Sequence, residues 1–85
     1  MNEDTLYIKE YLESRSEQAA YNLVQKYRKF VYLIVLQKIN DTEDAKDITQ
    51  EIFIKVLSSL GKFDNRSSFK TWLYRIAVNE TINVL

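Results

Sequence analysis

Apolar residues recur every three or four positions along most of the chain, which is the spacing of one face of an α-helix. The pattern predicts four helices, over about residues 4–13, 17–38, 42–60 and 68–85. The apolar run Phe30–Leu36 has the composition of a buried strand, but the helical spacing from Ala20 to Val35 continues through it and favours a helix. The predicted fold is all-α, a compact bundle of about four helices.

Polar residues that can cap a helix precede three of these segments. The candidates are Ser14, which forms a capping-box pattern with Glu17, then Asp41 or Thr42, and finally Ser67 or Ser68. The single glycine, Gly61, is predicted at the C′ position that ends the third helix. The polar connection 62–68 then separates the third helix from the fourth.

The third predicted helix has one apolar side and one acidic side on a helical wheel. The apolar arc, expected to face the core, consists of Ala45, Ile48, Thr49, Ile52, Phe53, Val56, Leu57 and Leu60. On the other side Asp44, Asp47 and Glu51 are aligned, with Gln50 beside them and Ile54 in the middle. This side is either a solvated face or a contact patch with an apolar centre and a polar rim, and as a contact patch it would take a basic partner.

The fourth predicted helix carries an aromatic stripe and a mixed polar side. The stripe, expected in the core, consists of Phe69, Trp72, Leu73, Ile76 and Ala77. Trp72 is therefore assigned to packing rather than to stacking on a base. Tyr74 lies on the polar side with Lys70 and Arg75, a combination that suits single-stranded nucleic acid, because bases stack on aromatic rings while cations hold phosphates. The alternative is that these three residues form an ordinary solvated surface.

Composition limits the chemistry of the chain. Its 85 residues, 46% hydrophobic with no proline and one glycine, suit one small helical domain. Histidine and cysteine are absent, which removes the usual general base, the thiol nucleophile and thiolate metal sites. We therefore expect no enzyme activity, cofactor or metal. The first residues lack the basic start and apolar core of an export signal, and no apolar run approaches the roughly 20 residues needed to span a bilayer. A cytoplasmic location without membrane contact is the expectation.

The zero net charge conceals an alternation along the chain. Residues 1–20 carry two cations and five anions, 21–40 four cations and no anions, 41–60 two and five, and 61–85 four and two. Domains that bind duplex DNA through its phosphates are usually basic overall, because much of that affinity comes from counterion release. A neutral domain is therefore expected to bind DNA weakly alone and to depend on a larger partner.

The run DAKDITQEIFIKVLSSLGKFDNRSSFKTWLYRIAVNETIN, residues 44–83, resembles regions 2.2 to 2.4 of bacterial sigma factors of the sigma-70 family, and most closely the extracytoplasmic-function (ECF) subgroup. The matching pieces include Gln50-Glu51, Phe63-Asp64 and the stretch Ser68–Ala77, and the preceding segment Tyr27–Tyr32 is similar to region 2.1. The resemblance implies a transcription-initiation module, a single region 2 domain over residues 1–85. It also implies a fragment of a longer protein that lacks the domain reading the −35 element.

The resemblance also implies roles for individual positions. In this family the region 2.2 helix docks on the coiled coil of the largest subunit of core RNA polymerase, and the matching residues are Asp44, Asp47, Gln50, Glu51 and Ile54. The following loop captures a base flipped out of the non-template strand of the promoter −10 element, and it corresponds to Phe63, Asp64, Asn65, Arg66, Ser67 and Ser68. The next helix contributes to −10 recognition and melting through Lys70, Tyr74, Arg75, Val78 and Asn79.

Two further expectations follow from the resemblance. Housekeeping members carry two adjacent aromatic residues at the positions of Arg75 and Ile76, so a strong aromatic melting wedge is not expected here. Anti-sigma factors commonly cover the polymerase-binding surface, so such an inhibitor is a further expected partner, overlapping residues 47–54. The alternative function is a helical adaptor that binds only protein, with the aromatic helix serving as core. A duplex reader is disfavoured because the fourth helix carries few cations and amides.

Overall fold

The computed structural model describes residues 2–85, and this part of the chain is helical with no β-strand. Its elements are α1 (Glu3–Ser14), α2 (Glu17–Ile39), α3 (Thr42–Ser59), the short 3-10 helix η1 (Leu60–Lys62) and α4 (Phe69–Asn83). The predicted all-α bundle of about four helices is confirmed. The apolar run 30–36 lies inside α2, as its helical spacing indicated.

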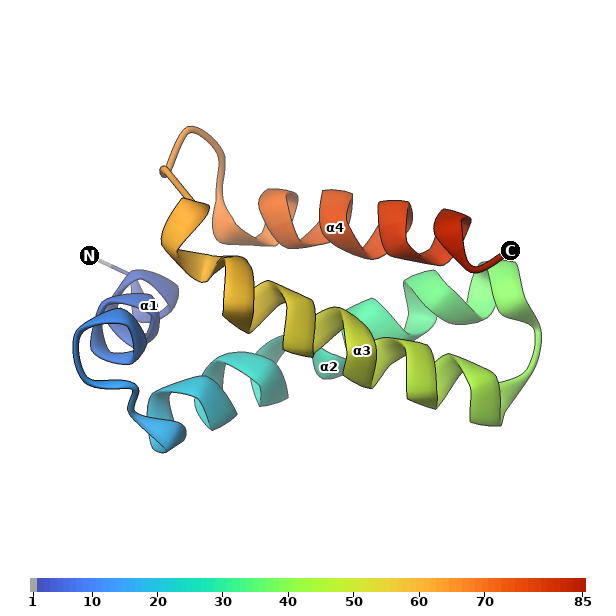
Figure 1. Cartoon of the computed structure of the whole chain (residues 1–85), viewed down its shortest axis with the longest axis horizontal. Helices are drawn as coiled ribbons and strands as arrows, with labels where there is room; N and C mark the ends of the chain where they lie inside the picture. The colour runs from blue at the N-terminus through green and yellow to red at the C-terminus, as the bar shows by residue number, and fades with distance from the viewer. Residues whose placement is uncertain (1) are drawn as a thin grey trace.

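Helix α2 is the central element of the bundle, and it packs against α1, α3 and α4. Figure 1 shows α3 and α4 running side by side in opposite directions across α2, while α1 is seen nearly end-on at one end of the molecule. The connection between α3 and α4 projects at this same end. The α2–α3 turn and the C-terminus lie together at the opposite end.

The core forms where one face of each helix meets the others. Its fully buried side chains include Leu23, Val31 and Val35 of α2, Ile52, Val56 and Leu60 of the α3–η1 segment, and Leu73 and Ala77 of α4. On α3 the predicted apolar arc is confirmed, because Ala45, Thr49, Ile52, Phe53, Val56 and Leu60 are buried and Ile48 and Leu57 are partly buried. Two threonines enter the core without an unpaired hydroxyl, since Thr49 and Thr81 donate to the carbonyl oxygens of Ala45 and Ala77, each at 2.7 Å.

Side-chain caps fix where α3 and α4 begin. Asp41 accepts a hydrogen bond from the backbone N–H of Asp44 at 3.0 Å, and Ser68 accepts one from Thr71 at 3.1 Å. Both residues were among the predicted candidates. Each cap satisfies a backbone N–H of the first helical turn that has no partner within the helix. The Ser68 cap therefore fixes the residue at which the loop ends and α4 begins.

Two predicted helix caps are wrong. Ser14 is the last residue of α1 and its hydroxyl donates to the Glu10 carbonyl, while Ser16 caps α2 by accepting from the Ala19 N–H at 3.1 Å. Arg15 takes the left-handed turn between the two helices, with φ 53°. Gly61 does not form a left-handed C′ cap either, because α3 tightens into η1 and carries Gly61 within that turn.

Candidate functional site

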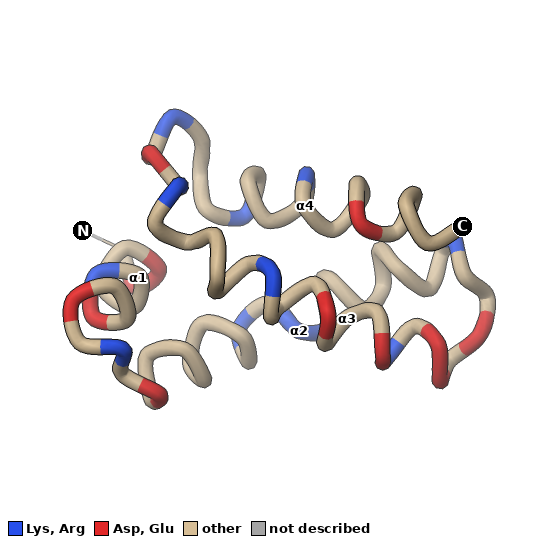
Figure 2. The backbone as a smooth tube through the Cα atoms, in the orientation of Figure 1, with Lys and Arg blue, Asp and Glu red and all other residues tan. Residues whose placement is uncertain are grey.

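The five residues predicted on the polar side of α3, Asp44, Asp47, Gln50, Glu51 and Ile54, are all exposed; we call them the acidic strip. Figure 2 shows acidic positions following one another along α3 from its N-terminal turns. The strip points outward because the opposite side of α3 is fixed in the core by Ala45, Ile52 and Val56. Ile54 is 69% exposed, so an apolar surface lies among the carboxylates.

The carboxylates of the acidic strip are not consumed by internal ion pairs. Within residues 2–85 the ion pairs of α3 involve Lys46 with Glu43 and Lys55 with Glu80, and none includes Asp44, Asp47 or Glu51. Three unpaired carboxylates in a row attract a cationic partner more effectively than paired ones would. They are spread along a helix rather than gathered, and in the described residues no three acidic side chains are placed to share a metal ion.

The loop between η1 and α4 is shaped by its own side chains. Asp64 accepts a hydrogen bond from the Arg66 backbone N–H at 3.1 Å and forms an ion pair with the Arg66 guanidinium, also at 3.1 Å. Asn65 at the tip has φ 65°, a left-handed conformation that asparagine tolerates better than most residues. The Arg66 side chain is 89% exposed, so its ion pair with Asp64 contributes little to stability.

Phe63 begins this loop and ties it to the core. Its ring lies 5.3 Å from the ring of Trp72 and 5.9 Å from that of Phe69, measured between centroids. Trp72 is half-buried in this cluster, which agrees with its assignment to packing. Phe63 therefore anchors the start of the loop in the core. Of the other loop residues, Ser67 is half-buried, and the exposed ones are Asp64, Asn65, Arg66 and Ser68.

A hollow of ≈ 290 Å³ lies between this loop and α1. Its lining includes Phe63 and Asn65 from the loop and Thr5, Lys9 and Leu12 from α1. The sequence analysis gave α1 no role, because the matching motifs lie in residues 27–32 and 44–83. The structure makes α1 the second wall of the space beside the loop.

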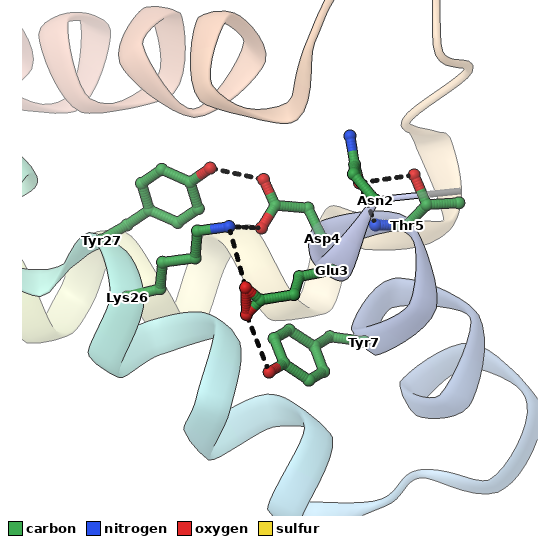
Figure 3. Close-up of polar contacts among 7 residues, drawn as sticks. All are labelled: Asn2, Glu3, Asp4, Thr5, Tyr7, Lys26 and Tyr27. Atoms are coloured by element: carbon green, nitrogen blue, oxygen red, sulfur yellow. Dashed lines mark hydrogen bonds and ion pairs between the residues drawn. The ribbon is translucent and has the colours of Figure 1, made fainter.

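A buried carboxylate holds α1 in this position, as Figure 3 shows. Asp4 accepts a hydrogen bond from the Tyr27 hydroxyl through one oxygen, and its other oxygen lies 2.8 Å from Lys26 Nζ. Burial and the hydrogen bond to Asp4 raise the pKa of Tyr27 well above its ordinary value, and the bond to Asp4 also raises the pKa of Lys26. The Asp4 side chain is thus fully partnered although it is buried.

The predicted nucleic-acid face of α4 is largely exposed. Lys70, Tyr74, Arg75 and Asn79 are exposed, and Val78 is half-buried. Ile76 is half-buried beside the exposed Arg75, and neither residue presents an aromatic ring here. Tyr74 is the aromatic side chain of this face, 49% exposed.

Phe30 of α2 adjoins this face, and the sequence analysis missed it. Its ring centroid lies 6.4 Å from that of Tyr74, and Lys70 Nζ lies 4.9 Å from it. The two aromatic rings and the cation form a mixed surface across the α2–α4 seam. Phe30 escaped notice because it sits in an apolar run, where helical spacing alone predicts packing.

Comparison with known proteins identifies a family for this arrangement. The Sigma-70 region 2 family model matches residues 23–85. The RNA polymerase sigma-H factor of Pseudomonas aeruginosa is 40% identical over 72 residues, which cover 84% of this chain and 37% of that protein. The ECF RNA polymerase sigma-E factor of Escherichia coli K12 is 42% identical over 72 residues, with the same coverage of 84% and 37%. The chain thus spans little more than a third of the length of these relatives.

A solved structure supports the same assignment. The NMR structure of an engineered region 2 of sigmaE in complex with GTAAAA matches this fold with a TM-score of 0.83 and 34% sequence identity, over 99% of this chain and 85% of that one. In residues 2–85 no helix combines the length and apolarity needed to cross a membrane. The fold, the motif spacing and the comparisons agree, and the chain belongs to the sigma-70 region 2 family, with ECF sigma factors among its relatives.

Proposed function

We propose that this domain binds core RNA polymerase through the acidic strip and presents its loop and α4 to the unpaired −10 element of a promoter. The observation that carries the proposal is the outward row formed by Asp44, Asp47 and Glu51, which has no internal ion pairs within residues 2–85. A cationic row on the coiled coil of the largest polymerase subunit is its complement. Ile54 supplies an apolar centre that would lose water on binding.

The proposed DNA surface comprises the loop 63–68 and the exposed face of α4. Asn65 at the loop tip lines the hollow facing α1, where an extruded base of the non-template strand would enter, and Arg66 follows it in the chain. Tyr74 and Phe30 offer rings for a further base, and Lys70, which lies over the Phe30 ring, and the exposed Arg75 would hold phosphates. The similar sigmaE region 2, solved with GTAAAA, supports a single-stranded ligand of this kind.

The two surfaces depend on each other. The domain has no net charge, so counterion release contributes little affinity for DNA by itself. Attachment to polymerase would raise the effective concentration of the loop at opened promoter DNA. The proposed activity is binding and positioning rather than catalysis. Binding to RNA polymerase would require a cytoplasmic location.

Charge reversal tests the polymerase contact. Glu51→Arg and Asp47→Arg are expected to abolish capture of core polymerase by the immobilised chain, while far-ultraviolet circular dichroism shows an unchanged helical content. Glu10→Arg is the matched control, because it makes the same charge change at an exposed position of α1, outside the acidic strip. A protein-only adaptor would bind polymerase equally well in all variants, and that result would refute the proposal.

Crosslinking tests the DNA contact. A single-stranded −10 oligonucleotide with a photoreactive base is expected to crosslink near Asn65, Arg66 or Tyr74 when core polymerase is present. Crosslinks confined to the far side of the bundle, or none above the level of a scrambled oligonucleotide, would exclude this surface.

We further propose that an anti-sigma factor binds over residues 47–54 and excludes polymerase. The support is the family resemblance together with the exposure of Asp47, Glu51 and Ile54. A competition assay decides the matter, since simultaneous binding of inhibitor and polymerase to one chain would rule out the overlap.

A further inference from the structure

The hollow between α1 and the loop 63–68 has apolar walls that suit the flat faces of a nucleobase. These walls come from Ile8 and Leu12 of α1 and from Phe63 of the loop. Their positions are fixed, because α1 packs against α2 and against η1, the turn that leads into the loop. The volume of ≈ 290 Å³ is at the lower end of the range for small-molecule pockets, which suits a single ring system.

Two charged residues of α1, Lys9 and Glu13, line the same hollow. They are four positions apart and therefore lie on one face of the helix, one turn from each other. Both are exposed, and within residues 2–85 neither forms an ion pair. The lysine precedes the glutamate, which is the less favourable order for a pair on a helix. Both charged groups are therefore available to a ligand in the hollow.

Lys9 and Glu13 differ from Asn65, the polar residue of the loop that lines the hollow, in the hydrogen bonds they can form. The lysine ammonium only donates and the ionised glutamate only accepts, whereas the asparagine amide does both and suits the edge of any base. One fixed donor and one fixed acceptor discriminate among bases, because a base that fits only one of them leaves the other charged group without a partner.

The groups that this pair requires occur together on two of the four bases. An exocyclic amino group would donate to Glu13, and a carbonyl oxygen would accept from Lys9. Cytosine and guanine carry both groups. Adenine has no carbonyl oxygen and offers the lysine only ring nitrogens. Thymine has no amino group, and its one ring N–H lies between two carbonyl oxygens that repel a carboxylate.

We propose that Lys9 and Glu13 determine which base enters the hollow and select a cytosine or a guanine. This inference rests on the proposed function, because it gives α1 the role of reading the base that the loop receives. Glu13 accepts a hydrogen bond from the amino group of the base, and Lys9 donates one to its carbonyl oxygen. The apolar walls contact every base alike, so the selectivity comes from the two charged residues.

Base substitution in the DNA tests the preference. Fluorescently labelled single strands of the −10 element, carrying A, C, G or T at each position in turn, are titrated with the polymerase-bound chain. At the position that crosslinks to Asn65, cytosine or guanine should bind about tenfold more tightly than adenine or thymine, as a specific base contact does. Two analogues without the amino group distinguish the sources: zebularine should abolish the preference if the base is cytosine, and hypoxanthine if it is guanine.

Substitutions in α1 test whether the two residues cause the preference. Glu13→Gln and Lys9→Gln are each expected to reduce the preference to about twofold or less, because one fixed hydrogen-bonding group is lost. Glu10→Gln is the matched control for the glutamate, at an exposed position of the same helix outside the hollow. Lys38→Gln is the control for the lysine, at an exposed position of α2. Both controls should keep the wild-type preference.

The outcomes separate this inference from the proposed function. If the wild-type complex binds the −10 strand without preferring cytosine or guanine, or if Glu13→Gln and Lys9→Gln keep that preference, the reading by α1 is refuted and the proposed function stands. Equal loss of affinity for all four bases in Lys9→Gln would also refute it, because the lysine would then hold a phosphate. Failure of the wild-type complex to bind any −10 strand would overturn the proposed function itself.

Discussion

The contribution of the hydrogen bond between Tyr27 and Asp4 to the stability of the fold can be predicted from the structure. Tyr27→Phe removes one hydroxyl and leaves the ring in place, packed against Phe69 at 5.4 Å and Phe30 at 6.3 Å between centroids. The substitution therefore isolates a single buried interaction from the packing around it. It leaves one oxygen of the buried Asp4 carboxylate without its donor, while Lys26 stays on the other.

The magnitude follows from the charge of the acceptor. A hydrogen bond to a charged group contributes about 1.5–3 kcal/mol, more than a neutral one, so Tyr27→Phe should cost about 2 kcal/mol of unfolding free energy. For a domain of this size each kcal/mol lowers the melting temperature by roughly 4–8 °C, which predicts a drop of roughly 10 °C. Because Asp4 and Tyr27 interact directly, Asp4→Ala/Tyr27→Phe should cost less than the sum of the single substitutions.

Thermal unfolding followed by circular dichroism at 222 nm measures the effect. Tyr21→Phe is the matched control: Tyr21 lies on the same helix, 58% exposed, and its hydroxyl accepts only from Gln25. It should change the free energy by less than about 0.5 kcal/mol. If Tyr27→Phe melts within about 2 °C of the wild type, the bond does not stabilise the fold and the argument for how α1 is anchored fails.

The remaining predictions concern pH, capping, the core and DNA. The pKa values of Tyr27 and Lys26 are raised above their ordinary values of 10.0 and 10.5, so the protonated forms of both groups stabilise the folded state. This stabilisation is complete below about pH 10 and is lost as the pH rises further. Between pH 8 and pH 11 the free energy of unfolding, measured by urea denaturation, should therefore fall more in the wild type than in Tyr27→Phe. Ser68→Ala should lower the free energy of unfolding by about 1 kcal/mol in urea denaturation, because α4 loses its cap. Ser58→Ala, the same change at an exposed position inside α3, should lower it by less. Leu73→Ala, at a fully buried position, should cost about 2–5 kcal/mol in urea denaturation. Phe30→Ala should reduce −10 oligonucleotide crosslinking in the polymerase complex by about as much as Tyr74→Ala does, with polymerase affinity unchanged, and a normal yield would remove Phe30 from the DNA surface.

The helices and their buried faces were accessible from the sequence because each obeys one local rule. On α3 the spacing of apolar residues predicted which side chains are buried, and the same wheel placed Asp44, Asp47 and Glu51 on the opposite side. These are properties of a single helix, so they need no knowledge of its neighbours.

The helix caps and the contacts between helices were less accessible, because they depend on competition between neighbouring residues and elements. Ser14 and Ser16 both have capping chemistry, and the choice falls to Ser16 because Arg15 takes the left-handed turn between two helices. Phe30 lies beside Tyr74 only because α2 packs against α4. Lys9 lies beside the loop only because α1 packs at that end of the bundle. No periodicity within one helix reports such contacts.

The position of α1 affects the hollow beside the loop 63–68, because residues of both α1 and the loop line it. Phe63 fixes the start of the loop on the aromatic cluster and Ser68 fixes its end at the α4 cap, so only residues 64–67 remain to adapt to a ligand. The hollow beside them has α1 as its other wall, and α1 is held to α2 through Asp4. Releasing α1 would open that hollow to water on one side and remove the surroundings of the extruded base in the proposed function. Tyr27→Phe should therefore weaken −10 crosslinking near the temperature at which α1 detaches, while Glu51 and the acidic strip, which lie on α3, continue to bind polymerase.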